Sequence, residues 1–202
     1  MNRRDLLRGA GIATAAFPLL ASSRGHAQVS AAPVNMLIAY HSVTGNTEKM
    51  AQGMSEGAKA VSGTNVVLKR VGDVAADDLL SSDAVMVGSP VYFANMSGEV
   101  KTFLDNWSLK FGLFQDRKMR NKVGAAFATA AVVSGGMETT ILGILGAMLN
   151  NQMIVVNGAG ASAITGPGSP GIDDKELVGA RDWGKRVAEV AAIVKRGATQ
   201  VQ

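Results

Sequence analysis

The sequence has no cysteine and only two histidines among its 202 residues. Without cysteine, the chain cannot form a disulfide or use a thiolate as nucleophile or metal ligand. The histidines are His26 and His41, which are too few for an ordinary zinc site. A hydrolase triad built on histidine is equally hard to assemble. We therefore expect no metal centre and no histidine-based hydrolytic site.

Residues 1–27 have the three parts of an export signal. Arg3 and Arg4 form a basic start, an uncharged and weakly apolar run covers residues 9–21, and residues 25–27 form a small-x-Ala cleavage site. The run is too short to remain as a membrane anchor. The paired arginines resemble a twin-arginine signal, although no phenylalanine follows them. We expect export, to the periplasm, of a mature domain covering residues 28–202.

The mature chain has almost no net charge. Removing four arginines and one aspartate with the signal turns 20 basic and 16 acidic residues into 16 and 15. A nearly neutral chain gives no reason to expect nucleic acid or an anionic membrane as partner. A small molecule or a redox protein is the expected partner.

Strand-like and helix-like segments alternate along the mature chain. The expected strands cover 36–40, 65–71, 84–88, part of 123–133, and 153–156. The expected helices cover 47–61, 74–80 (as a helix or turn), 97–107, 138–150 and 172–196. Residues 157–171, rich in glycine and proline, are expected to form a loop. This alternation predicts an α/β domain with a parallel sheet covered by helices on both faces.

Ligands of such sheets bind beyond the carboxyl ends of the strands, so the loop after residues 36–40 comes first. It reads Ser42-Val-Thr-Gly-Asn-Thr47 and leads into the first helix. Its hydroxyls, and the unpaired N–H groups of a helix start, favour a phosphate. Because the lysine of a triphosphate-binding P-loop is absent, a monophosphate fits better. An ordinary capped turn explains the same residues about equally well.

Two further loops lie at the same edge. Residues 89–98 carry Tyr92, Phe93 and Met96, which a flat heteroaromatic ring would cover. Local packing under a long loop is the alternative. Residues 130–137 contain adjacent glycines, which permit close approach of a ligand.

These motifs carry a family resemblance. Ser42–Thr47 resembles the flavodoxin phosphate loop, and the tail from Glu176 to Ala188 is similar to the last helix of the WrbA-type NAD(P)H:quinone oxidoreductases. The segment Gly88-Ser-Pro-Val-Tyr-Phe-Ala-Asn-Met-Ser-Gly-Glu-Val-Lys-Thr-Phe-Leu-Asp105 resembles the flavin loop and following helix of the same family. The resemblance implies a flavodoxin-like, doubly wound, five-stranded sheet of order 2-1-3-4-5 with noncovalently bound FMN.

The resemblance also implies which residues contact FMN. The phosphate loop is Ser42, Val43, Thr44, Gly45, Asn46 and Thr47. The isoalloxazine ring would be lined by Pro90, Val91, Tyr92, Phe93 and Asn95. The segment that closes over the ribityl chain and ring would supply Thr129, Ala130, Ala131, Ser134 and Gly135.

The sequence departs from the family pattern in three places. Residues 130–133 replace a stretch rich in threonine and glycine, and Tyr92 stands where arginine is common. Asn150 and Asn151 occupy the place of a histidine on the substrate side of the flavin. An amide donates a hydrogen bond to a quinone oxygen but does not deliver a proton near neutral pH.

The implied activity is transfer of two electrons from NAD(P)H through FMN to a quinone-like acceptor. The flavin carries this chemistry, so no side chain is assigned as catalytic acid or base. An exported flavodoxin-type electron carrier is the alternative. The nearly neutral mature chain argues against the carrier, since such carriers typically have a strongly acidic surface. Export argues against the reductase, since NAD(P)H is scarce outside the cytoplasm. A scaffold that has lost its flavin is a third interpretation, which residues 130–133 support weakly. The family resemblance implies a homodimer or homotetramer, whereas flavodoxins proper are monomers.

Overall fold

The computed structural model describes residues 32–132, 135–156, 162–164 and 171–200. The chain divides into two units, residues 1–30 and 31–202, and all the described residues belong to the second. The export signal expected over residues 1–27 therefore lies outside the described residues.

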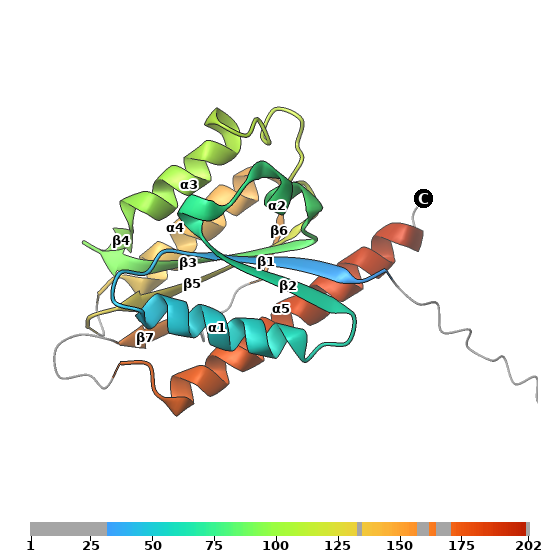
Figure 1. The fold of residues 1–202 in the computed structure, drawn as a ribbon. Helices are drawn as coiled ribbons and strands as arrows, with labels where there is room; N and C mark the ends of the chain where they lie inside the picture. Colours follow the sequence, from blue (N-terminus) through green and yellow to red (C-terminus); the bar gives the residue numbers. More distant parts are fainter. Residues whose placement is uncertain (1–31, 133–134, 157–161, 165–170, 201–202) are drawn as a thin grey trace, which may run out of the picture. The chain divides into compact units, whose positions relative to one another are not determined.

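Five strands form a parallel sheet in the order β2-β1-β3-β5-β6 (Figure 1). They are β1 (Val34–Tyr40), β2 (Thr64–Arg70), β3 (Ala84–Tyr92), β5 (Val123–Ala130) and β6 (Ile154–Val155). Counted along the chain, these strands have the expected order 2-1-3-4-5. The apolar third strand lies between β1 and β5 and is buried from Ala84 to Ser89, whereas β2 lies at an edge and is partly exposed along its length. The predicted doubly wound fold is confirmed.

Two short strands were not expected. β4 (Asn95–Met96) pairs antiparallel with β3, and β7 (Ser162–Ile164) pairs parallel with β5. β6 pairs with residues 123–124 at the start of β5, and β7 pairs with residues 128–130 at its end. The prediction of a loop over 157–171 is therefore wrong at 162–164, because so short a strand is defined by its pairing and not by its own pattern.

The helices cover both faces of the sheet (Figure 1). α1 (Asn46–Lys59) and α5 (Asp174–Gln200) pack on one face, where Met36 and Ile38 of β1 point. The 3₁₀ turn η1 (Val71–Asp73), α2 (Ala76–Ser81), α3 (Gly98–Leu109) and α4 (Met137–Asn150) pack on the other, with Leu37 and Ala39. Successive side chains of one strand therefore enter different cores.

α1 and α5 approach each other backbone to backbone. A Cβ atom added at Gly57 would overlap the backbone of Arg181, and one added at Gly184 would overlap the backbone of Met54. The absence of side chains at these two positions allows the close crossing, which packs the second half of α1 against α5. None of the helices within the described ranges has the length and apolarity that crossing a membrane requires.

Candidate functional site

The loops that follow β1, β3 and β5 meet at the carboxyl edge of the sheet. The backbone N–H of His41, after β1, donates to the carbonyl of Gly88 in β3 over 3.1 Å. The side-chain oxygens of Thr47 and Thr129 lie 2.8 Å apart, which joins the first turn of α1 to the end of β5. The three loops predicted from the sequence are therefore neighbours in space.

The first loop has the backbone of an anion cradle. Gly45 precedes α1 at φ 86°, a left-handed conformation that favours glycine. Its N–H donates to Ser42 Oγ over 3.1 Å. The amide groups of Asn46, Thr47 and Glu48 find no acceptor within the described part of the chain. These N–H groups and the helix dipole are therefore available to an anion.

The side chains of this loop fit a phosphate ester. Ser42 and Thr44 Oγ1 already accept one hydrogen bond each, from Gly45 N–H and from the Asn46 amide, so each hydroxyl keeps its own proton to donate. The two hydroxyls of Thr47 and Thr129 carry two protons, and their mutual hydrogen bond uses one of them, so one O–H remains to donate to a ligand. Val43 is 71% exposed, and a Cβ at Gly45 would meet nothing within 4 Å, so the cradle is not filled by its own side chains.

Sequence reasoning missed a cation at this loop. Arg70, the last residue of β2, donates from Nη1 to the carbonyl of Ser42 and from Nη2 to Glu48 Oε2, both over 2.7 Å. Tyr40 donates its hydroxyl hydrogen to Glu48 Oε1 over 2.8 Å. Burial, then this hydrogen bond, raises the pKa of Tyr40 above its ordinary value. The guanidinium therefore braces the loop, with its charge balanced by Glu48, and no local pattern marks Arg70 for this role.

The second loop is a tight hairpin. Val91 pairs with Met96 and Tyr92 with Asn95, so Phe93 and Ala94 alone form the turn, at φ 49° and 62°. Positive φ at both central residues is typical of a type I′ turn. The turn leaves Phe93 fully exposed, at 105%, and Tyr92 at 42%. Two aromatic side chains are thus presented at the edge where a flat ring was expected.

Hydrogen bonds hold this hairpin at both ends. Ser97 N–H donates to Ser89 Oγ over 2.9 Å, and both serines are fully buried. Thr139 of α4 donates its hydroxyl to the carbonyl of Ala94 over 2.8 Å. The hairpin is therefore fixed both at its base and at its tip.

The third loop carries the remaining predicted contacts. Thr129 and Ala130 are buried at the end of β5, and Ala131 is exposed. Gly135 N–H donates to the carbonyl of Val132 over 3.0 Å, which closes a turn before α4. Ser134 lies outside the described residues. Thr129, just before the hydroxyl-poor segment noted in the sequence, thus contacts Thr47 at the end of the phosphate loop.

His41 does not form a hydrolytic triad. Its Nδ1 lies 2.9 Å from Ser97 Oγ and 3.5 Å from Glu99 Oε2, so one ring nitrogen serves both neighbours. A triad needs the two ring nitrogens for different partners. The ring also meets Tyr92 edge to face, at 6.3 Å between centroids. His41 therefore links the phosphate loop to the hairpin.

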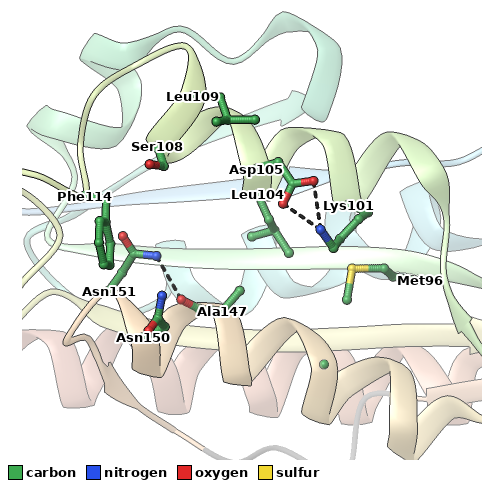
Figure 2. Close-up of a pocket in the computed structure, with 11 residues that line it drawn as sticks. Met96, Lys101, Leu104, Asp105, Ser108, Leu109, Phe114, Ala147, Asn150 and Asn151 are labelled. Carbon is green, nitrogen blue, oxygen red and sulfur yellow. Dashed lines mark hydrogen bonds and ion pairs between the residues drawn. The ribbon is translucent and has the colours of Figure 1, made fainter.

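Asn150 and Asn151 are not brought to these loops within one chain. They end α4, just before β6 pairs with the first residues of β5, so they lie near the amino ends of the strands. There they line a groove of about 360 Å³ between α3 and α4, which reaches from Met96 to the two asparagines (Figure 2). The Asn151 amide donates to the carbonyl of Ala147 over 2.9 Å.

Comparison with known proteins agrees with this geometry. A family described as NADPH-dependent FMN reductase matches residues 73–166. A protein of Geotalea uraniireducens named NAD(P)H dehydrogenase (quinone) is 30% identical, over 81% of this chain and 100% of its own length. The chain belongs to this NAD(P)H dehydrogenase (quinone) family. A second member, from Geotalea daltonii, is 32% identical over 78% of this chain and 97% of its own.

Solved structures place this NAD(P)H dehydrogenase (quinone) family member among flavodoxin-like proteins. The WrbA-like flavodoxin of Agrobacterium tumefaciens superposes with a TM-score of 0.66 at 26% identity, covering 78% of this chain and 97% of its own. Oxidised flavodoxin 2 of Bacillus cereus has a TM-score of 0.63 at 20% identity, covering 78% and 99%, and shows the shared fold. Within the described residues, no cluster of three or more histidine, aspartate or glutamate side chains is arranged to hold a metal ion.

Proposed function

We propose that the chain is an FMN-dependent oxidoreductase that transfers two electrons from NAD(P)H to a quinone-like acceptor. The observation that carries this proposal is the meeting of the three loops, joined at Thr47 and Thr129. An open anion cradle lies there beside a hairpin that exposes two aromatic rings. The names of the relatives, FMN reductase and NAD(P)H dehydrogenase (quinone), support the cofactor, the donor and the acceptor.

FMN, when bound, would supply the redox chemistry, which is the transfer of a hydride from NAD(P)H and of two electrons onward to the acceptor. The overall reaction consumes one proton as a quinone becomes a hydroquinone and NAD(P)H becomes NAD(P)⁺. The chain's own residues bind and orient. Amides at the start of α1, with Ser42 and Thr44, would hold the phosphate, while Tyr92 and Phe93 would flank the ring and exclude water from it.

The test is spectroscopic. Purified protein should be yellow or become yellow with added FMN, and anaerobic NADH or NADPH should bleach it. A quinone such as 1,4-benzoquinone should then restore the colour. Protein that takes up no FMN would contradict the proposal. Yellow protein that neither donor bleaches would instead support the electron carrier. At present the near-neutral mature chain and the names of the relatives argue against the carrier.

We also propose that the protein is exported to the periplasm through a twin-arginine-type signal. Support comes from the order of the basic start, the uncharged run and the small-x-Ala site in residues 1–27. Export in the folded state suits a domain that must bind FMN first. Replacing Arg3 and Arg4 together by lysine should retain the protein in the cytoplasm, whereas Arg24→Lys, outside the pair, should not. Export that is unchanged by the double replacement would contradict the proposal.

Assembly into a homodimer or homotetramer is a further part of the proposal. Leu109, Phe114, Leu142 and Leu149 are 83%, 44%, 65% and 57% exposed on α3, α4 and the segment after α3. A second copy covering this surface would bury them. Asn150 and Asn151 line the groove beside Leu109 and Phe114, so a second copy on this surface would also face them. Light scattering during size-exclusion chromatography should give a molar mass that is a multiple of the mass of one chain. Leu142→Glu should lower this molar mass. A monomeric mass for the unaltered protein would contradict the assembly.

A further inference from the structure

A cleft of about 640 Å³ lies next to the phosphate loop, between η1 and α3. Residues 70–74 form one wall, and the first three turns of α3 form the other. The buried ring of Phe103 borders the cleft from the α3 side. Tyr40 borders it from the end of β1, with its ring packed in the core of the other sheet face and the Arg70 guanidinium 5.6 Å from its centroid. Gly72 and Gly98 border the cleft, and a Cβ at either would meet nothing within 4 Å. The cleft is therefore open and has a partly aromatic lining.

The α3 wall offers hydrogen-bonding groups that the protein does not use. Thr102 and Asn106 lie one helical turn apart and both line the cleft. Neither side chain has a hydrogen-bond partner in the described ranges. A carboxamide can donate and accept at the same time, which suits the N6 and N7 edge of adenine. The Phe103 ring and the unpaired amide of Asn106, about one turn apart on α3, fit a flat heteroaromatic base.

His41 connects this cleft to the proposed flavin site. It lines the cleft, directly precedes the phosphate loop and contacts the Tyr92 ring of the hairpin. A dinucleotide with one end over the hairpin would have its other end near the cleft. Resting on the proposed function, we propose that this cleft binds the adenosine half of the pyridine-nucleotide donor.

The charges around the cleft favour a donor with a free ribose hydroxyl. Arg70 lines the cleft, but its guanidinium already pairs with Glu48 and Ser42. The remaining charged side chains are the carboxylates of Asp73 and Glu99 and the ammonium of Lys110. Carboxylates accept hydrogen bonds from a ribose hydroxyl and repel a 2′-phosphate. NADH is therefore expected to be preferred over NADPH.

The experiment separates the adenosine half from the rest of the donor. Asn106→Leu removes the amide, and Gly72→Leu places a side chain at the mouth of the cleft where the protein itself leaves room. Each variant should raise the KM for NADH at least tenfold while leaving the KM for reduced nicotinamide mononucleotide, which lacks adenosine, within twofold. The FMN dissociation constant should not change. Gly197→Leu is the matched control, an open glycine at the far end of α5.

A binding measurement needs no turnover. Titration calorimetry with ADP should detect binding to the unaltered protein and to Gly197→Leu, with at least tenfold loss in both cleft variants. Equal ADP affinity in all four proteins, or no ADP binding at all, would overturn the inference. Equal rises in KM for both donors would also overturn it. If neither donor reduces the flavin, the proposed function fails, and calorimetry still decides whether the cleft binds adenosine.

Discussion

The side-chain oxygens of Thr47 and Thr129 lie 2.8 Å apart, although the residues are separated by 82 positions in the sequence. Both side chains are almost fully buried, at 1% and 3% exposure. Their hydrogen bond joins the helix that follows the phosphate loop to the strand that leads into the third loop. A substitution at either threonine should therefore alter the hydrogen bonding of the other.

Replacing Thr47 by valine tests this link. Valine keeps the shape but leaves the Thr129 hydroxyl buried without its partner, so we expect a loss of about 1–3 kcal/mol in the free energy of unfolding. Denaturant titration of the FMN-free protein measures this. In the double variant Thr47→Val/Thr129→Val, no hydroxyl remains unpaired, so stability should recover in part. Additive losses from the two changes would show that the hydroxyls do not depend on each other.

Arg70→Ala tests the brace on the phosphate loop. The change removes the donor to the Ser42 carbonyl and leaves Glu48 without its cationic partner in the first turn of α1. An unbalanced carboxylate next to a phosphate should raise the FMN dissociation constant at least tenfold, measured by flavin fluorescence. Arg181→Ala breaks an exposed pair with Glu56 on the same helix and should leave FMN affinity unchanged. Equal effects of the two variants would argue against a specific brace.

Thr44→Glu places a carboxylate in the cradle itself. Because Thr44 is exposed beside the unpaired amides of α1, we expect FMN affinity to fall more than tenfold. Thr44→Gln, similar in size but neutral, should lose far less. Equal FMN affinity of the glutamate variant and the unaltered protein would contradict the assignment of this loop as the phosphate site.

The raised pKa of Tyr40 leads us to expect a particular change in the free energy of unfolding at high pH. Burial and the neighbouring Glu48 raise the pKa of Tyr40 above its ordinary value of 10.0. The neutral phenol is favoured in the folded state, so its contribution is fully present below pH 10 and is lost as pH rises through the raised value. Tyr40→Phe should therefore flatten the decline in unfolding free energy from about pH 9 to 11. Tyr92→Phe, at the other of the two tyrosines, is the control, and an unchanged decline in Tyr40→Phe would refute the prediction.

Ala94 occupies a backbone conformation that glycine adopts more easily, with φ at 62° in the hairpin turn. We expect Ala94→Gly to raise the free energy of unfolding by about 1 kcal/mol, since it relieves strain at an exposed position. Ala60→Gly, at an exposed residue with φ −70°, should instead lower it. Stability that falls in both variants would mean that the turn is not strained.

Much of the site could be predicted because it depends on local pattern. Alternating apolar runs indicated the strands and helices, and a glycine before a helix start indicated the cradle at Gly45. For Tyr92 and Phe93 the sequence left two interpretations open, a surface that a ligand covers and local packing under the loop, and their exposure in the structure favours the first. The place of Asn150 and Asn151 within one chain was also open to prediction, because they precede a parallel strand, and residues before a strand lie at the edge opposite to the loops that follow strands.

The sequence by itself determined the layered fold and the positions of the three loops, because periodicity and turn chemistry act over a few residues. Only the tertiary structure decided that Thr47 pairs with Thr129, that Arg70 braces Ser42, and that residues 162–164 form a strand. These features depend on which side chains and backbones packing brings together from distant parts of the chain, and no local pattern specifies such contacts.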